Sequence, residues 1–293
     1  MIPEHVMREL RYIEVYTGKR VRNLRVGPYT SPQRGPGFDF DEHQPYRHGD
    51  DVRRIDWNVT ARMAAPFVRH THAERELNVM IAIDVSRSMA LGAAGRSKKE
   101  LMTLITGSLL FSAASDQINS GFLAFSDRVL EYSPPRRTRA AAWTVLERCW
   151  ALDPRSGRTA LVPAIRHLLA TLKRMSVVFI VSDFITDEDL FGSQALAMLA
   201  AKHDVIAVVP EDPAETALPA GRGYVNVRDL ETGRQVAVGL SARTRRAYAD
   251  QMRERRAALA RAFYRVPIDH VFVPTDGSPV EPLLSLFAAR MAR

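Results

Sequence analysis

The sequence predicts an α/β fold: a doubly wound, mostly parallel sheet with helices on both faces, preceded by a smaller N-terminal element that contains strands. Two observations support this prediction. The apolar runs Val79–Ile83 and Val177–Val181 have the length and composition of strands that are buried on both faces. From about Leu77 onward, strand-like runs alternate with segments of helical periodicity, which is typical of parallel strands joined by crossover helices.

The first 75 residues differ in character from the rest of the chain. Glu4–Tyr16 has a helical pattern, and the segment GPYTSPQRGPG that follows at 27–37 is rich in glycine and proline, as loops are. Residues 38–58 are polar, aromatic and charged by turns, which favours short strands and tight turns held by ion pairs. We therefore predict a strand and loop element over 1–75 and a main domain with a C-terminal helical extension over 76–293.

Each element of the main domain is predicted from its apolar spacing. The expected strands are Val79–Ile83, Gly121–Phe125, Val129–Tyr132, Ser176–Val181, Val205–Val209 and His270–Val273. The expected helices are Lys98–Ala114, Thr138–Trp150, Leu161–Leu172, Asp189–Ala201, Ser241–Tyr264 and Val280–Ala289. Thr138 is a candidate helix cap, and the tripeptide ETG at 231–233 is a candidate hairpin turn.

Composition limits the class of protein. No segment has the roughly 18 consecutive apolar residues that a membrane span needs, and the N-terminus lacks the basic start and apolar core of a signal peptide, so we expect a cytoplasmic location. The net charge of +8 is compatible with an acidic partner, including nucleic acid. However, the arginines are scattered along the chain, which favours a solvated surface over a binding groove.

Cysteine and histidine give no strong sign of a site. The single cysteine, Cys149, lies in an apolar helical stretch and is predicted to be a core thiol. His43, His48, His70 and His72 lie near one another in sequence, but their spacing favours hydrogen-bonded or surface histidines over a zinc site. No phosphate-binding glycine loop, G-x-S-x-G elbow or H-E-x-x-H motif is present.

The strongest candidate site lies where predicted strands end. Asp84, Ser86 and Ser88 directly follow the first core strand, and Asp183 follows the second. In an open parallel sheet, ligands bind beyond the carboxyl ends of the strands, and Thr159 can add a hydroxyl from a third loop. Oxygen ligands of this kind suit Mg²⁺, and two neighbouring carboxylates would repel without a cation. The alternative is an aspartate and two serines that cap the next helix.

These residues resemble a known site. DVSRSM, Thr159 and the SD of VSDF are similar to the metal-ion-dependent adhesion site of von Willebrand factor A domains. Upstream, GFDFDEHQPYRHGDDVRRIDWNVTAR, followed by FVR and EREL, resembles the bacterial domain-of-unknown-function 58 family, which couples such an element to an A-like domain. The resemblance extends over about 35–210 and implies a von Willebrand factor A-like main domain.

The resemblance also implies roles for single residues. Asp84, Ser86, Ser88 and Thr159 would bind Mg²⁺, or alternatively Mn²⁺ or Ca²⁺, directly or through water, and Asp183 would act mainly through water. The remaining coordination position would accept an acidic side chain of a protein partner.

This chain departs from the family pattern on both sides of Thr159. Arg158 stands where glycine is common, and Ala160 stands where an acidic residue is common. A guanidinium at this place would either weaken cation binding or hold the partner carboxylate. We assign Arg158, together with Arg87, to partner binding.

The function that follows is a non-enzymatic, metal-dependent protein–protein interaction module. The resemblance implies a MoxR-type AAA+ ATPase as its partner, in a chaperone-like or maturation system. One alternative is a metal-dependent hydrolase or phosphotransferase built on Asp84 and Asp183, against which the sequence offers no evident general base or nucleophile. A second alternative is nucleic-acid binding by the arginine-rich helix Ser241–Tyr264.

Overall fold

The chain forms two compact units, Met1–Arg25 with Leu77–Arg293, and Val26–Glu76. The computed structural model describes residues 2–20, 34–47, 50–63, 65–72, 77–90, 92, 95–137, 139–152, 158–228 and 235–292. The division differs from the predicted boundary after residue 75, because helix α1 (Glu4–Arg20) belongs to the larger unit. Its buried side chains Val6, Leu10 and Ile13 give it an apolar face, and it packs on α3 (Lys98–Ser115).

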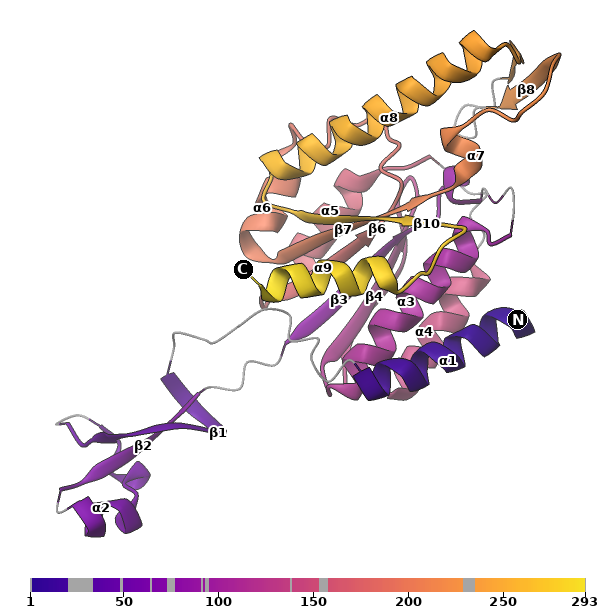
Figure 1. Ribbon diagram of the computed structural model, residues 1–293. Coiled ribbons are helices and arrows are strands. Elements are labelled where there is room, and N and C mark those ends of the chain that lie inside the picture. The colour runs from indigo at the N-terminus through magenta and orange to yellow at the C-terminus, as the bar shows by residue number, and fades with distance from the viewer. Residues whose placement is uncertain are drawn as a thin grey trace. The chain divides into compact units, whose positions relative to one another are not determined.

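A central sheet of six strands organises the described part of the larger unit (Figure 1). Its order is β10-β7-β6-β3-β4-β5, and all neighbours are parallel except β5, which runs antiparallel to β4. The strands are β3 (Asn78–Asp84), β4 (Asn119–Phe125), β5 (Val129–Arg136), β6 (Ser176–Val181), β7 (Asp204–Glu211) and β10 (Asp269–Pro274). From β5 to β10, chain order reads 3-2-1-4-5-6, the order of a doubly wound sheet, so the predicted fold class is confirmed.

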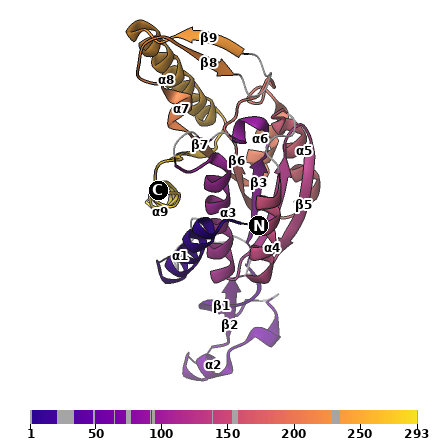
Figure 2. The ribbon, with the colours of Figure 1, turned by 90° about the vertical axis from the view of Figure 1, so that its right-hand side faces the viewer.

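Helices cover both faces of this sheet (Figure 2). On one face, Met80, Ala82 and other apolar strand residues form a core with α5 (Leu161–Thr171) and α6 (Gln194–Lys202). On the other face, the ring of Phe179 meets that of Phe287 on α9 (Glu281–Met291), with centroids 6.2 Å apart. Helix α3 lies on this second face and also contacts α4 (Arg139–Ala151). Strands covered on both faces explain the continuous apolar runs in the sequence.

The helix predicted to start at Asp189 begins later, at Gln194, after the N-cap Ser193. The backbone turns first, because Asp189 Oδ1 accepts a hydrogen bond of 3.0 Å from Gly192 N. The candidate cap Thr138 and the ETG turn lie outside the described residues.

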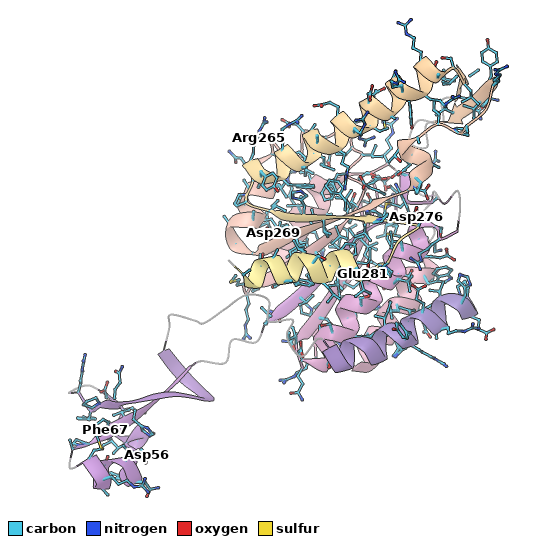
Figure 3. All side chains as sticks on the ribbon, viewed as in Figure 1. Asp56, Phe67, Arg265, Asp269, Asp276 and Glu281 are labelled. Atoms are coloured by element: carbon cyan, nitrogen blue, oxygen red, sulfur yellow. The ribbon has the colours of Figure 1, made fainter. Side chains whose placement is uncertain are left out.

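Four elements form what we call the C-terminal arm: α7 (Pro213–Thr216), β8 (Tyr224–Arg228), β9 (Gln235–Gly239) and α8 (Ala242–Arg265). Strands β8 and β9 pair antiparallel, as the predicted hairpin requires. Helix α8 is capped by Ser241 and is anchored by the buried Phe263, whose ring lies 5.0 Å from that of Phe184. Figure 3 labels Arg265, the last residue of α8, and Asp269, where β10 begins.

The smaller unit contains strands, as predicted. Strand β1 (Arg34–Pro45) pairs antiparallel with β2 (Phe67–His72), and η1 (Val52–Arg54) and α2 (Trp57–Met63) lie between them in the chain. Asp56, labelled in Figure 3, joins these elements: its amide donates to Phe67 O, and its carboxylate accepts from the amides of α2 and lies 3.0 Å from His43 Nε2.

The structure also locates the single cysteine and one of the four neighbouring histidines. Cys149 is buried, and burial raises the pKa of its thiol to about 12, as expected of a core thiol. His43 pairs with Asp56, while His48 and the side chains of His70 and His72 lie outside the described residues. None of the helices in the described segments is both long and apolar enough to cross a membrane.

Candidate metal centre

The candidate site lies between β3 and β6, where the order of the sheet reverses. The two strands are parallel neighbours, and Ile83 is paired in register with Val181. The next residues are Asp84, the last residue of β3, and Ser182, which directly follows β6, so they lie side by side at the carboxyl edge of the sheet. Ligands of doubly wound sheets bind in the crevice at such a reversal. A shared site depends on this adjacency of the two strands.

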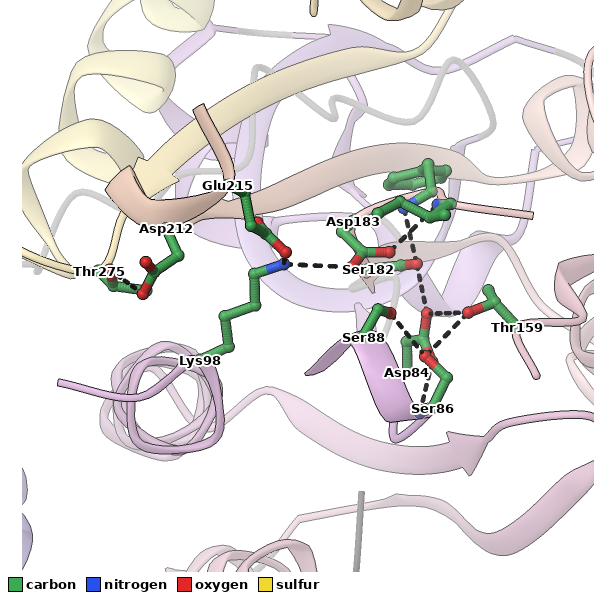
Figure 4. Close-up of polar contacts among 12 residues, drawn as sticks. Asp84, Ser86, Ser88, Lys98, Thr159, Ser182, Asp183, Asp212, Glu215 and Thr275 are labelled. Atoms are coloured by element: carbon green, nitrogen blue, oxygen red, sulfur yellow. Dashed lines mark hydrogen bonds and ion pairs between the residues drawn. The ribbon is translucent and has the colours of Figure 1, made fainter. Parts of the chain in front are cut away.

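Asp84 is the centre of the polar contacts at this edge (Figure 4). It is fully buried, and its Oδ1 accepts a hydrogen bond of 2.8 Å from the amide of Ser86. Its Oδ2 accepts a short bond of 2.6 Å from the hydroxyl of Ser182 and lies 3.4 Å from Thr159 Oγ1. Three separate loops therefore hold this one carboxylate.

Three hydroxyls lie beside it. Ser86 Oγ is 3.1 Å from Ser88 Oγ and 2.8 Å from Thr159 Oγ1. All three side chains are buried. The structure thus brings together Asp84, Ser86, Ser88 and Thr159, four of the five residues that the sequence assigned to the metal.

The next long helix, α3, does not use Asp84, Ser86 or Ser88 as its cap. Helix α3 is capped by Ser97, whose hydroxyl accepts from the amide of Glu100 while the Glu100 carboxylate accepts from the amide of Ser97. This reciprocal capping box satisfies the helix start without the earlier residues.

The loop that carries Thr159 is fixed by residues that the sequence reasoning missed. Thr186 donates its hydroxyl to Thr159 O at 2.9 Å. Glu188 Oε2 accepts from the amides of Leu161 and Val162, at 2.6 and 3.0 Å, at the start of α5. Because the N-cap Ala160 has no capping side chain, Glu188 supplies that role from the loop after β6.

The fifth assigned residue, Asp183, faces a different partner. Its Oδ1 accepts from the amide of Ile185 at 3.1 Å, and its Oδ2 lies 3.2 Å from the ammonium of Lys98. Lys98 also binds Glu215 Oε1 at 2.6 Å. The sequence reasoning treated Lys98 only as the first residue of a helix and did not consider Glu215. No local pattern marks either residue, since the pairs join positions 85 and 117 residues apart.

Burial and charge set the acidity of this cluster. Burial, followed by the charge of Asp183, raises the pKa of Asp84 from 3.8 to about 7, and hydrogen bonds from Ser182 and Ser86 oppose that rise. Burial also raises the pKa of Glu215, which the charge of Lys98 opposes. For Lys98, burial acts to lower the pKa, but the charges of Asp183 and Glu215 outweigh it and raise the pKa above its usual value.

The donor set fits a hard divalent cation. One carboxylate and three hydroxyls at a polar edge are oxygen donors, which Mg²⁺ prefers, and a cation would favour the ionised form that burial disfavours at Asp84. Among the residues that the structure describes, no group of three or more histidine, cysteine, aspartate or glutamate side chains could hold a metal. An ion at this edge would therefore depend on the serine and threonine oxygens.

The two arginines assigned to partner binding lie outside the polar cluster. The side chain of Arg158 is 67% exposed and pairs at 3.7 Å with Asp187, which is itself 93% exposed. Arg87, between Ser86 and Ser88 in sequence, is also exposed. Because its side chain is exposed, Arg158 is accessible to solvent and to a partner. An exposed ion pair of this kind contributes little to stability, so breaking it would cost little.

Comparisons with known proteins agree with the predicted resemblance. The family model described as "Protein of unknown function DUF58" matches residues 42–258. The uncharacterized proteins Mb1516 of Mycobacterium bovis and Rv1480 of Mycobacterium tuberculosis are each 30% identical over 226 residues, which is 76% of this chain and 70% of theirs.

Two of the solved structures that match this chain have low sequence identity to it. The conserved hypothetical protein BatB of Bacteroides thetaiotaomicron is 18% identical with a TM-score of 0.45, covering 74% of this chain and 98% of its own. A von Willebrand factor type A protein of Catenulispora acidiphila is 10% identical with a TM-score of 0.42, covering 76% of this chain and 43% of its own. With most of its length matched by one family model, this chain belongs to the DUF58 family of proteins of unknown function, as its N-terminal motif predicted.

Proposed function

We propose that this chain is a non-enzymatic protein-interaction module that binds an acidic side chain of its partner through a divalent cation, Mg²⁺ above all. The ion would be held by Asp84, Ser86, Ser88 and Thr159, with Asp183 acting through water. One observation supports this most: the four oxygen-bearing side chains meet at the reversal point of a doubly wound sheet.

The chemistry of the cluster favours binding over turnover. The groups around Asp84 are hydroxyls that already donate to it or to one another, and the one lysine at the edge is paired with two carboxylates. None of these groups is a free base placed to activate water or a serine hydroxyl. A bound ion would supply positive charge that offsets the lost hydration of a partner carboxylate, and Arg158 could pair with the same carboxylate.

The arginines of α8 support a solvated surface there, rather than a nucleic-acid groove. Arg253 pairs with Asp250, and Arg261 with Glu254 at 2.6 Å, both on the same helix. Arg256 pairs with Glu211 at 3.0 Å. Because these charges are compensated within the chain, fewer of them are available to phosphates.

The partner that we propose is a MoxR-type AAA+ ATPase, in a chaperone-like or maturation system. The ATPase would supply nucleotide hydrolysis, and this chain would supply recognition. The proposal rests on membership of the DUF58 family and on the surface position of Arg158 beside the metal edge.

The test compares Asp84→Asn with the wild type. Asparagine keeps the size of the side chain but lacks the charge, so Mg²⁺ binding measured by calorimetry should weaken by about a hundredfold or more. Capture of a purified MoxR-type ATPase should be lost both in this variant and in wild type with chelator. Arg158→Gly should weaken capture while leaving Mg²⁺ binding in place.

Two results would oppose the proposal. Unchanged Mg²⁺ binding in Asp84→Asn would remove the ion from this edge. Association at full strength in chelator would mean that the partner docks elsewhere, and a steep loss with salt would then favour the arginines of α8.

A further inference from the structure

Lys98 occupies an unfavourable position for a lysine. Its side chain is 0% exposed, and it is the first residue of α3, directly after the N-cap Ser97. A helix N-terminus carries a partial positive charge, which disfavours a cation beside it. Burial of an ammonium is costly as well, unless it is paired and hydrogen-bonded. A methionine would fill the same volume without either cost, so packing alone does not explain a lysine here.

The compensation comes from two carboxylates on different elements. Asp183 lies just beyond β6 and Glu215 lies on α7, and Lys98 Nζ contacts them at 3.2 and 2.6 Å (Figure 4). Glu215 in turn offers its carbonyl to the hydroxyl of Tyr248 on α8, at 3.0 Å. The ammonium therefore connects the carboxyl edge of the sheet, where the candidate metal site lies, with the C-terminal arm.

Lys98 also alters the charge that a divalent ion would meet. Three carboxylates, Asp84, Asp183 and Glu215, gather at this edge, and Lys98 compensates the two that it contacts. The Lys98 ammonium would repel a divalent ion bound near Asp183. The ion would therefore be attracted less strongly than it would be by the carboxylates alone.

We propose that Lys98 is the built-in cation of this edge. It holds Asp183 and Glu215 together when no divalent ion is bound, and its charge limits how tightly an ion binds. The first statement concerns the metal-free protein alone. The second rests on the proposed function.

The first statement is tested in chelator with Lys98→Met, which keeps the volume and removes the charge. The buried Asp183 and the partly buried Glu215 would lose their counter-charge, so the melting temperature should fall by about 10 °C. Adding Asp183→Asn to Lys98→Met should recover a large part of that loss, because an amide needs no cation. A melting temperature equal to that of wild type, or no recovery in the double variant, would overturn the statement.

The second statement is tested by Mg²⁺ calorimetry on two variants with opposite expected effects. Lys98→Met should bind Mg²⁺ about tenfold more tightly, because a repelling charge is removed. Glu215→Gln should bind it more weakly than wild type, because Lys98 is then less compensated. Glu215 is partly exposed, so Glu215→Gln should fold even where Lys98→Met does not, and unchanged or tighter Mg²⁺ binding in this variant would by itself overturn the affinity-limiting role. A purely structural lysine would give weaker binding in both variants, and that result would overturn the affinity-limiting role.

Lys99→Met is the matched control. Lys99 is the next residue of α3, but its ammonium donates to Leu152 O at 3.0 Å and lies over the ring of Trp150, away from the carboxylates. Its substitution should leave Mg²⁺ affinity unchanged. Absence of Mg²⁺ binding in wild type would overturn both the proposed function and the affinity-limiting role of Lys98, while the chelator experiment would still decide the first statement.

Discussion

At the scale of single residues, Asp84 shows how surroundings change an ordinary side chain. Complete burial and the charge of Asp183 raise its pKa to about 7, although Ser182 and Ser86 donate hydrogen bonds to it. These bonds keep the carboxylate oriented while its ionised form is disfavoured. A cation beside such a group would favour its ionised form, and without one the group lowers the stability of the protein at neutral pH.

The stability of the metal-free protein should therefore depend on the protonation of Asp84. The pKa in the folded chain is about 7 against an ordinary 3.8, so the folded state keeps a proton that the unfolded state releases. The stabilisation from that proton is complete below about pH 4 and is lost as pH rises through about 7. Urea unfolding in chelator should show this decline in wild type, relative to Asp84→Asn. Parallel pH curves for the two proteins would contradict the raised pKa.

At the scale of elements, the carboxyl edge is organised by loops that hold each other. The loop after β6 carries Asp183, Thr186 and Glu188, and the last two bind the loop that carries Thr159. Ala160 N also donates to Ser126 O at 2.7 Å, which ties the same loop to the end of β4. The position of the Thr159 hydroxyl is thus set by neighbouring strands and not by helix α5 alone.

Glu188→Ala should loosen this arrangement. The amides of Leu161 and Val162 would lose their acceptor at the start of α5, so the free energy of unfolding should fall by about 1 kcal/mol. Mg²⁺ binding should weaken as well, because Thr159 is held less firmly. Asp187→Ala is the neighbouring control, since Asp187 is almost fully exposed and pairs with the exposed Arg158. Equal effects of the two substitutions, by urea unfolding and calorimetry, would argue against the cap.

At the scale of the whole molecule, the order of the sheet places the candidate site, and α1 completes the larger unit. Helix α1 covers α3 so closely that a Cβ atom on Gly107 would lie 2.3 Å from Leu10 Cδ2. A side chain at position 107 would therefore require the Leu10 side chain to shift. The first helix belongs to the core of the larger unit, although residues 26–76 separate it from that unit in sequence.

Leu10→Ala should accordingly destabilise the larger unit. Leu10 is fully buried, and its truncation should lower the free energy of unfolding by about 3 kcal/mol. Arg8→Ala on the exposed face of the same helix is the control and should change stability little. Circular dichroism melts would check both variants. A cost for Leu10→Ala as small as that of the control would place α1 outside the core.

The fold class, the family and four members of the candidate site could all be predicted from local patterns in the sequence. The apolar runs of β3 and β6 predict two buried neighbouring strands, and the residues that directly follow such strands must lie at the sheet edge. Buried strands and the residues that follow them can be recognised locally, because the apolar pattern of a strand lies in consecutive residues. Apolar periodicity predicts a start for α6 at Asp189, which is too early. The turn at Asp189–Gly192 depends on a side-chain hydrogen bond, and periodicity does not report such bonds.

The distant side chains that complete the edge could be identified only once the fold was known. Ser182 donates to Asp84 across 98 positions of sequence, and Lys98 reaches Glu215 across 117. The position of Ser182 directly after β6 predicts its place at the edge but not its bond to Asp84, and a lysine at a helix start has no pattern that distinguishes it from a solvated residue. Their roles arise because the doubly wound order brings β3, β6 and the first turn of α3 to one edge, where burial makes each charge require a partner. The same holds for α1, whose place in the core depends on contacts made across the chain.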